Sequence, residues 1–300
     1  MSTTVRPRLL QIAHLPLPAL EQEMARQYDV SCLADQADPA AFLAQQGASF
    51  SGVVTSAPVG ARNDVLAALP GLRVISSFGV GFDALDIPYL QSRGIQVGYT
   101  PDVLNDCVAD LAFALMLDVS RGVSASDRFV RSGGWLTGRF PVQTRVSDKR
   151  LGIVGLGRIG RAVAERAQGF RMEVSYFNRQ PIPDSSYRYA ESIVELARWA
   201  DYLVLTVAGG AGSRHLVDRA VRDALGPQGF LINVARGTVV DAPPRLDDAV
   251  GVADDHVLAG ARAEVGDLDE HAVAVGAGPA AARGLVATEQ LHEAVDVGVH

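Results

Sequence analysis

A short glycine-rich turn constrains the fold of this chain more than any other feature. In LGIVGLGRIGRAVAERA, residues 151–167, an apolar run leads into the pattern GxGxxG, and a run with helical periodicity follows. A further strand-like run, EVSYF, comes about 20 residues after the turn. This order predicts a strand–turn–helix unit that binds the pyrophosphate of a dinucleotide, rather than a glycine-rich turn without a ligand.

Each glycine of the turn has its own physical reason. Gly155 permits the tight turn, Gly157 lets the backbone approach the phosphates, and Gly160 lets the helix pack close to the strand. The amides at the start of the helix would face the anion, because the helix dipole favours negative charge there. The predicted cofactor-binding turn therefore comprises Gly155, Leu156, Gly157, Arg158, Ile159 and Gly160.

The end of the second strand bears on the choice of cofactor. It carries Asn178 and Arg179, where an NAD-specific site usually places a carboxylate against the ribose 2′-hydroxyl. A carboxylate would repel a 2′-phosphate, whereas Arg179 can pair with one through charge-assisted hydrogen bonds. Arg158, in the turn itself, can approach the same group. The alternative is that Arg179 is only a solvated arginine at a strand end. Asn178 and Arg179 thus favour NADPH (NADP) over NADH.

Short apolar runs alternate with helix-like stretches along the first 240 residues. Strand-like runs occur at RLLQIA, SGVVTS, LRVISSFG and IQVGYT in the first 100 residues, and at LGIVG, EVSYF, YLVLTVA and FLINVA after residue 149. Between the two sets, residues 101–135 predict a long apolar helix and then a more polar one, which Gly133-Gly134 ends. The pattern predicts an α/β protein with two doubly wound parallel sheets and crossover helices.

Composition and charge exclude several kinds of protein. A net charge of −7 argues against a nucleic-acid partner, no apolar run is long enough for a membrane span, and the first residues lack the apolar core of a secretory signal. The two cysteines, Cys32 and Cys107, have neither disulfide-framework nor zinc-ligand spacing. We therefore expect a cytoplasmic protein without a metal site.

Five stretches of the chain, one of which contains the glycine-rich turn, indicate a family when they are taken together. They are SSFGVGFDALDIPYLQSRGIQV, TPDVLNDCVADLAFAL, RFVRSGGW, KRLGIVGLGRIGRAVAERA and FLINVARGTVVD, and they cover roughly residues 50–241. In this order they resemble the D-isomer-specific 2-hydroxyacid dehydrogenase family, and are most similar to its NADPH-dependent glyoxylate/hydroxypyruvate reductase branch. The resemblance implies a flavodoxin-like substrate-binding domain at residues 1–100, completed by about 285–300. It also implies a Rossmann nucleotide-binding domain at 101–284, with the active cleft between the two domains.

The resemblance also implies roles for particular residues. The loop Phe78, Gly79, Val80 and Gly81 would hold the substrate carboxylate with backbone amides, although GVG could also be a mere tight turn. Arg236 would contact the keto oxygen and the carboxylate of the substrate, a task that suits a planar and always charged guanidinium; the alternative is a surface arginine. The nicotinamide pocket would be lined by Val207, Ala208, Val234, Ala235 and Arg236. The apolar helix 106–120 is either ordinary core or part of a homodimer interface at about 101–150, and we expect a homodimer.

The last 60 residues depart from the family pattern. Residues 241–300 carry 12 acidic residues against three arginines, and no Phe, Tyr, Trp or Ile. The family uses a histidine as acid/base, held by a glutamate, but the chain has no Pro-His pair, and Arg283 stands where the histidine belongs. Asp269 or Glu270 would take the place of the glutamate, and we assign Glu270. Three histidines of this segment, His256, His271 and His292, are predicted to be solvated, and His215 matches a position outside the catalytic set.

Two functions are consistent with these features. The first is an oxidoreductase that transfers a hydride from NADPH to a small 2-keto acid, of the glyoxylate or hydroxypyruvate type, and gives the D-2-hydroxy acid. In that case Arg236 polarises the substrate and Glu270 belongs to the catalytic set. The alternative is an NADP-binding sensor or scaffold with little or no turnover, because the tail lacks the catalytic histidine of the family.

Overall fold

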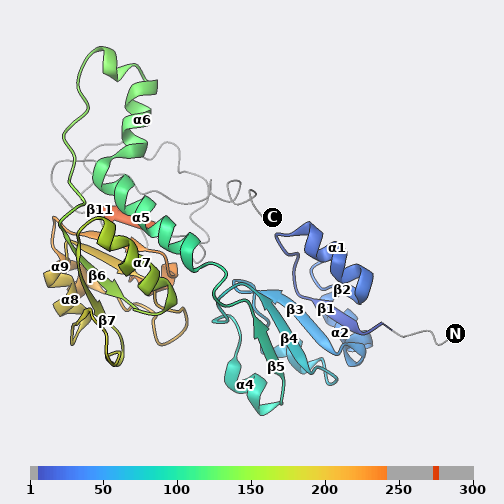
Figure 1. The fold of residues 1–300 in the computed structure, drawn as a ribbon. Helices are drawn as coiled ribbons and strands as arrows, with labels where there is room; N and C mark the ends of the chain where they lie inside the picture. The colour runs from blue at the N-terminus through green and yellow to red at the C-terminus, as the bar shows by residue number, and fades with distance from the viewer. Residues whose placement is uncertain (1–5, 242–272, 277–300) are drawn as a thin grey trace. The chain divides into compact units, whose positions relative to one another are not determined.

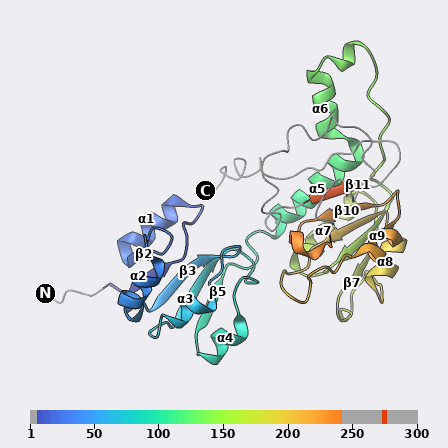
Figure 2. The same cartoon turned by 180° about the vertical axis from the view of Figure 1, so that it is seen from behind.

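The chain folds into two compact units, Met1–Leu104 and Asn105–His300. The computed structural model describes residues 6–241 and 273–276 (Figure 1), and Figure 2 shows the same ribbon from behind. None of the described helices combines the length and the apolar character needed to cross a membrane. The predicted completion of the first domain by residues 285–300 lies outside the described residues.

The first unit is a five-stranded parallel sheet with the order β2-β1-β3-β4-β5. This order is that of a flavodoxin-like doubly wound sheet. Its elements are β1 (Arg8–Gln11), α1 (Pro18–Gln27), β2 (Asp29–Cys32), α2 (Pro39–Gln46), the 3₁₀ turn η1 (Gly47–Ser49), β3 (Gly52–Ser56), α3 (Asn63–Ala67), β4 (Val74–Phe78), α4 (Ile87–Ser92) and β5 (Gln96–Tyr99).

Local chemistry explains where several helices of this unit begin. Asp38 and Asp86 precede α2 and α4, and their carboxylates accept hydrogen bonds from the amides of Ala41 and Tyr89, both at 3.0 Å. A proline stands in the first turn of each of these helices, where its missing N–H costs nothing. The central strand β3 is buried along its whole length, as expected for a strand covered on both faces.

The second unit holds a six-stranded sheet with the order β11-β10-β9-β6-β7-β8. Counted along the chain from β6, this is the Rossmann order 3-2-1-4-5-6. Its elements are α5 (Asn105–Arg121), α6 (Val123–Arg131), η2 (Gly134–Leu136), β6 (Arg150–Val154), α7 (Arg158–Gly169), β7 (Glu173–Phe177), β8 (Arg188–Tyr189), α8 (Ile193–Trp199), β9 (Tyr202–Leu205), α9 (Arg219–Leu225), β10 (Phe230–Asn233), η3 (Gly237–Val239) and β11 (Val273–Gly276).

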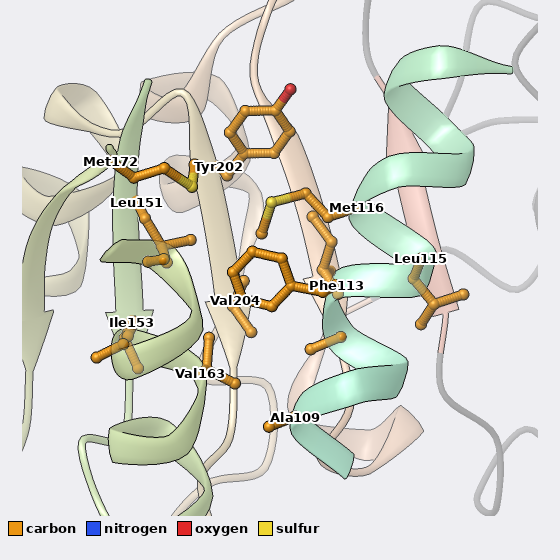
Figure 3. Packing of buried hydrophobic residues seen from close by; sticks show 14 of the residues in the cluster. Ala109, Phe113, Leu115, Met116, Leu151, Ile153, Val163, Met172, Tyr202 and Val204 are labelled. Atoms are coloured by element: carbon orange, nitrogen blue, oxygen red, sulfur yellow. The ribbon is translucent and has the colours of Figure 1, made fainter. Parts of the chain in front are cut away.

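The long helix α5 belongs to the core of the second unit. Its residues Ala109, Phe113 and Met116 are buried against the sheet, and Figure 3 shows Phe113 and Met116 facing Val204 and Tyr202 of β9. The hydroxyl groups of Ser120 and Tyr202 form a buried hydrogen bond of 2.9 Å, which fixes the far end of the helix. The apolar helix 106–120 was interpreted either as ordinary core or as part of a homodimer interface. For the face that carries Ala109, Phe113 and Met116, the structure supports core packing.

The prediction of two doubly wound α/β sheets is confirmed, with one difference in strand direction. β11 pairs with β10 antiparallel, through Phe230 opposite Gly276, whereas the other strands of the second sheet are parallel. The predicted helix pair in residues 101–135 is confirmed as α5 and α6. Gly133 follows α6 with a φ of 80°. This is the left-handed conformation that glycine commonly adopts just after a helix ends.

Candidate nucleotide and substrate site

The glycine turn connects β6 to α7 in the way its spacing predicts. Gly155 has φ of 101°, and an added Cβ there would lie 2.9 Å from both the amide nitrogen and Cγ1 of Val207. At Gly160 an added Cβ would collide with the carbonyl oxygen of Gly155 and lie 3.0 Å from Oγ1 of Thr206. At Gly157 it would meet nothing within 4 Å. Two of the glycines therefore allow close packing, and Gly157 leaves open space in front of the backbone.

Two polar side chains hold the turn in place. The amide of Leu156 donates to Oδ1 of Asn178 at 2.8 Å, and the hydroxyl of Thr206 donates to the carbonyl oxygen of Gly155 at 2.6 Å. Gly157 precedes α7, and no side chain caps the helix there. The first amides of α7 therefore keep their capacity to bind an anion, which the helix dipole favours.

A cavity of about 840 Å³ opens beside this turn. Three segments at the carboxyl edge of the sheet form its wall: the glycine turn, the end of β7 and the loop after β9. The lining residues are Gly155, Gly157, Phe177, Asn178, Arg179, Gln180, Thr206, Val207, Ala208, Gly209, Gly210, Ala211, Gly212, Ser213 and Leu216. This edge is where open α/β sheets bind nucleotides, and the volume suits an organic cofactor.

The charge of the cavity wall is positive where the second strand ends. Arg179 is exposed and lies in the wall, and within the described part of the chain the lining set contains no aspartate or glutamate. Arg158, at the start of α7, is also exposed. A site of this kind tolerates an additional phosphate group, because no carboxylate of the wall opposes it.

The cavity brings together six of the predicted cofactor residues. Gly155, Gly157, Asn178, Arg179, Val207 and Ala208 line it, whereas Leu156, Arg158, Ile159 and Gly160, in the turn and the first turn of α7, are not among its lining residues. The loop Gly209–Ser213 also lines the cavity and was not among the predicted cofactor residues. The feature that could have indicated it is the glycine-rich stretch AGGAGS directly after a predicted strand. In this loop Ser213 donates to the carbonyl oxygen of Ala208 at 2.7 Å, which folds the loop back onto the end of the strand.

Arg236 follows β10 at the same edge of the sheet. Since Asn233 is in register with Leu205, the segment Val234, Ala235 and Arg236 begins beside the loop that contains Val207. The carbonyl oxygen of Arg236 accepts hydrogen bonds from Nδ2 of Asn233 at 2.8 Å and from the amide of Val239 at 3.1 Å. The side chain is half-buried. The backbone of this arginine is thus fixed on both sides, although these three residues are not part of the cavity wall.

In the first unit, the loop after β4 has two unused amides. Gly79, with φ of 126°, donates its amide to Oγ1 of Thr100 at 3.1 Å, and the carbonyl oxygen of Phe78 accepts from the amide of Ala57. Within residues 6–241, the amides of Val80 and Gly81 donate to no other group. Of the four predicted residues, Val80 and Gly81 therefore retain the donors that an anion needs.

The predicted tail residues lie outside the described part of the chain. This holds for Asp269, Glu270 and Arg283, and for the histidines His256, His271 and His292. The described residues contain two histidines, His14 and His215, and neither lines the cavity. Nδ1 of His215 lies 3.5 Å from Oδ1 of Asp241, and both side chains are half exposed.

Comparison with known proteins identifies the family. Residues 113–261 match the sequence model of the NAD binding domain of D-isomer specific 2-hydroxyacid dehydrogenases. A hydroxyphenylpyruvate reductase of Plectranthus scutellarioides is 45% identical over 224 residues, which are 75% of this chain and 72% of that protein. A glyoxylate/hydroxypyruvate reductase A of Arabidopsis thaliana is 41% identical over 222 residues, 74% of this chain and 71% of its own length.

Solved structures agree with this result. The NADPH-dependent glyoxylate/hydroxypyruvate reductase of Sinorhizobium meliloti, in complex with NADP and malonate, aligns with a TM-score of 0.73 and 34% identity over 79% of this chain and 73% of that one. A 2-hydroxyacid dehydrogenase of Ketogulonicigenium vulgare gives a TM-score of 0.72 with 41% identity, over 79% and 75% of the two chains. The chain therefore belongs to the D-isomer specific 2-hydroxyacid dehydrogenase family of oxidoreductases.

Proposed function

We propose that this protein reduces a small 2-keto acid of the glyoxylate or hydroxypyruvate type to the D-2-hydroxy acid, with NADPH as the reductant. The observation that carries the proposal is the cavity at the glycine turn. It combines an open backbone at Gly157 with the cation of Arg179, and among the described residues no carboxylate of its wall opposes a 2′-phosphate. Of the relatives named above, the Arabidopsis and Sinorhizobium proteins are glyoxylate/hydroxypyruvate reductases, the Plectranthus protein is a reductase of the larger 2-keto acid hydroxyphenylpyruvate, and the Sinorhizobium protein binds NADP.

The residues of the second unit would hold the cofactor. The amides at the start of α7 would bind the pyrophosphate, with Gly157 leaving room for it, and Arg179 would bind the 2′-phosphate. Val207, Ala208, Val234 and Ala235 would lie along the nicotinamide. When bound, the cofactor supplies the hydride. This division assigns cofactor binding to the domain at 101–284 and substrate binding chiefly to the domain at 1–100.

The charged and polar groups would act on the substrate. Arg236 would polarise the keto group and hold the carboxylate with its planar fork. The amides of Val80 and Gly81 would hold the same carboxylate. Reduction also requires a proton at the substrate oxygen. Because neither described histidine lines the cavity, an NADP-binding protein with little turnover stays the alternative function, and the assay below separates the two.

The reaction is tested on the purified full chain by following the loss of reduced-nicotinamide absorbance. We expect oxidation of NADPH with glyoxylate and with hydroxypyruvate, and a higher kcat/KM with NADPH than with NADH. NADPH binding is measured in parallel by the change in its fluorescence. Binding without oxidation would contradict the reductase proposal and support the sensor or scaffold.

Arg179→Ala is the variant that tests the cofactor preference. Loss of a hydrogen bond to a charged group costs about 1.5–3 kcal/mol, so KM for NADPH is expected to rise by about 10- to 100-fold, while KM for NADH stays near its original value. Arg198→Ala, at an exposed position of α8, is the matched control and leaves both constants unchanged. Equal effects of Arg179→Ala on the two cofactors would refute the assigned role.

We also propose that the protein forms a homodimer through residues 101–150. α6 has no buried residue, and Val123 and Val130 on it are more than half exposed. In the segment that follows, Trp135 is 63% exposed and Leu136 90% exposed. Exposed large apolar side chains close together in the chain mark an interaction surface. The inner face of α5 is occupied by the core, so α6 and the 133–145 segment would supply most of this contact.

Leu136→Asp tests the dimer, because burial of a charge without a partner opposes association. We expect a dimer for the unmodified chain and a monomer for the variant, measured by light scattering after size-exclusion chromatography, with the same far-UV circular dichroism spectrum in both and a lower melting temperature for the monomer. Val59→Asp places the same change at an exposed valine of the first unit and is expected to leave the dimer intact. A Leu136→Asp protein that remains dimeric would place the interface elsewhere.

A further inference from the structure

A group of potential metal ligands gathers at the carboxyl ends of β1 and β2 in the first unit. His14 follows β1, Cys32 is the last residue of β2, and Asp35 lies in the turn after it. Their ligand atoms, an imidazole nitrogen, the thiol sulfur and a carboxylate oxygen, all lie within 4.8 Å of one another. Parallel pairing of β1 with β2 produces this arrangement, since Gln11 is in register with Cys32.

The imidazole of His14 is already oriented by a second carboxylate. Its Nδ1 lies 3.3 Å from Oε1 of Glu21, and its Nε2 lies 2.9 Å from Oδ1 of Asp35. Glu21, on α1, is itself fixed, because the amide of Leu15 donates to it at 2.8 Å and Nε2 of Gln11 donates to it as well. α1 lies beside β2 in both views of the ribbon (Figures 1 and 2). A histidine held by a carboxylate through one nitrogen is the usual support of a metal-binding histidine.

The local charge favours a cation. The carboxylates of Glu21 and Asp35 lie against the two nitrogens of the His14 imidazole, at 3.3 and 2.9 Å. An ion held by Asp35 and Cys32 would therefore have a second carboxylate close by, and opposite charges attract.

We propose that His14, Cys32 and Asp35 bind one Zn²⁺ ion, with water as the fourth ligand. Nitrogen, sulfur and carboxylate oxygen are the ligand types of zinc, and bonds of 2.0–2.3 Å in a tetrahedron place ligand atoms roughly 3.3–3.8 Å apart. The separations within the cluster need only small side-chain movements to reach these values, and His14 is 61% exposed and accessible to an ion. On binding, the thiol of Cys32 releases its proton to solvent, and His14 binds through a neutral imidazole nitrogen.

The site would tie the loops after β1 and β2 together. β1 and β4 are separated by β3 in the sheet, so the ion would lie about 10 Å along the sheet edge from the loop after β4. The ion is thus expected to stabilise the edge of the sheet and to take no part in hydride transfer.

The test uses the full chain after removal of metal with a chelator. Co²⁺, added as a spectroscopic substitute for zinc, is expected to bind one ion per chain and to give the absorption band of a cobalt–thiolate bond. Zn²⁺ is expected to displace it and to raise the melting temperature. Cys107→Ser removes the other cysteine, which is exposed on α5, and should change neither result.

Three variants separate this site from other metal binding. Cys32→Ser is expected to abolish the thiolate band, and Asp35→Asn to weaken Zn²⁺ binding. Glu21→Gln, which keeps an oxygen for the Leu15 amide, is expected to weaken it by about 10- to 100-fold. The histidines of residues 242–300 are present in every variant, so they cannot account for a difference in metal binding between the variants. Stoichiometric binding that persists in Cys32→Ser, or no cobalt–thiolate band in the unmodified chain, would overturn the proposal.

Discussion

Replacing Gly157 by alanine is expected to weaken NADPH binding by about 100-fold and to leave the fold unchanged. An added methyl group at this position meets no protein atom within 4 Å, and the backbone φ of −87° suits alanine. The space that the methyl would occupy is the space that the proposed pyrophosphate needs. Fluorescence titration with NADPH measures the affinity, and thermal unfolding measures the stability.

Gly160→Ala is the matched control for Gly157→Ala within the same turn. Its Cβ would collide with the carbonyl oxygen of Gly155, close to the hydrogen bond from Thr206. Overpacking of this kind lowers the free energy of unfolding by about 1–3 kcal/mol, so a lower melting temperature is expected here. If Gly157→Ala bound NADPH as tightly as the unmodified chain, the turn would not be the cofactor site.

The sequence predicted those parts of the site that depend on local backbone chemistry. The three glycines could be assigned from spacing alone, because a tight turn, a close approach and close packing each exclude a side chain. The ends of β4, β7, β9 and β10 were found for a similar reason. Each strand is a short apolar run that stops at small or polar residues, and the carboxyl ends of parallel strands meet at one edge.

The contacts that hold the site were not predictable in the same way. The bond from the Leu156 amide to Asn178 and the bond from Thr206 to Gly155 join residues far apart in the chain, and they depend on strand order and register. Asn178 was assigned to the cofactor, and the structure shows that its side-chain oxygen also supports the turn. The amide of Gly79 was assigned to the substrate, but it is used by Thr100.

Edge strands were the weakest part of the sequence prediction. β2 and β8 were not among the predicted strands, because β2 has no buried residue, and β8 is two residues long. The cluster of His14, Cys32 and Asp35 was missed with β2. Sequence spacing alone predicts no metal site there, and only the parallel pairing of β1 with β2 brings His14 to Cys32.

Arg236→Lys is expected to lower kcat/KM for the 2-keto acid by about 100- to 1,000-fold, the usual cost of losing one stabilising donor at a reacting oxygen. Lysine keeps the charge, but it lacks the planar fork that can bind a carboxylate and a keto oxygen together. The backbone should not move, since the carbonyl oxygen of Arg236 accepts hydrogen bonds from Nδ2 of Asn233 and from the amide of Val239. Steady-state kinetics with glyoxylate and hydroxypyruvate measure the effect.

The control for Arg236→Lys has to exclude a loss of cofactor binding and a general effect of arginine replacement. NADPH affinity of the variant is therefore expected to stay within about threefold of the original, because lysine keeps the positive charge and the backbone contacts of residue 236 do not depend on its side chain. Arg219→Lys makes the same change at an exposed position of α9, where the arginine pairs with Asp223, and should leave kcat/KM unchanged. An Arg236→Lys enzyme with full activity would show that a positive charge at this edge suffices. An equal loss in NADPH affinity would instead assign Arg236 to the cofactor.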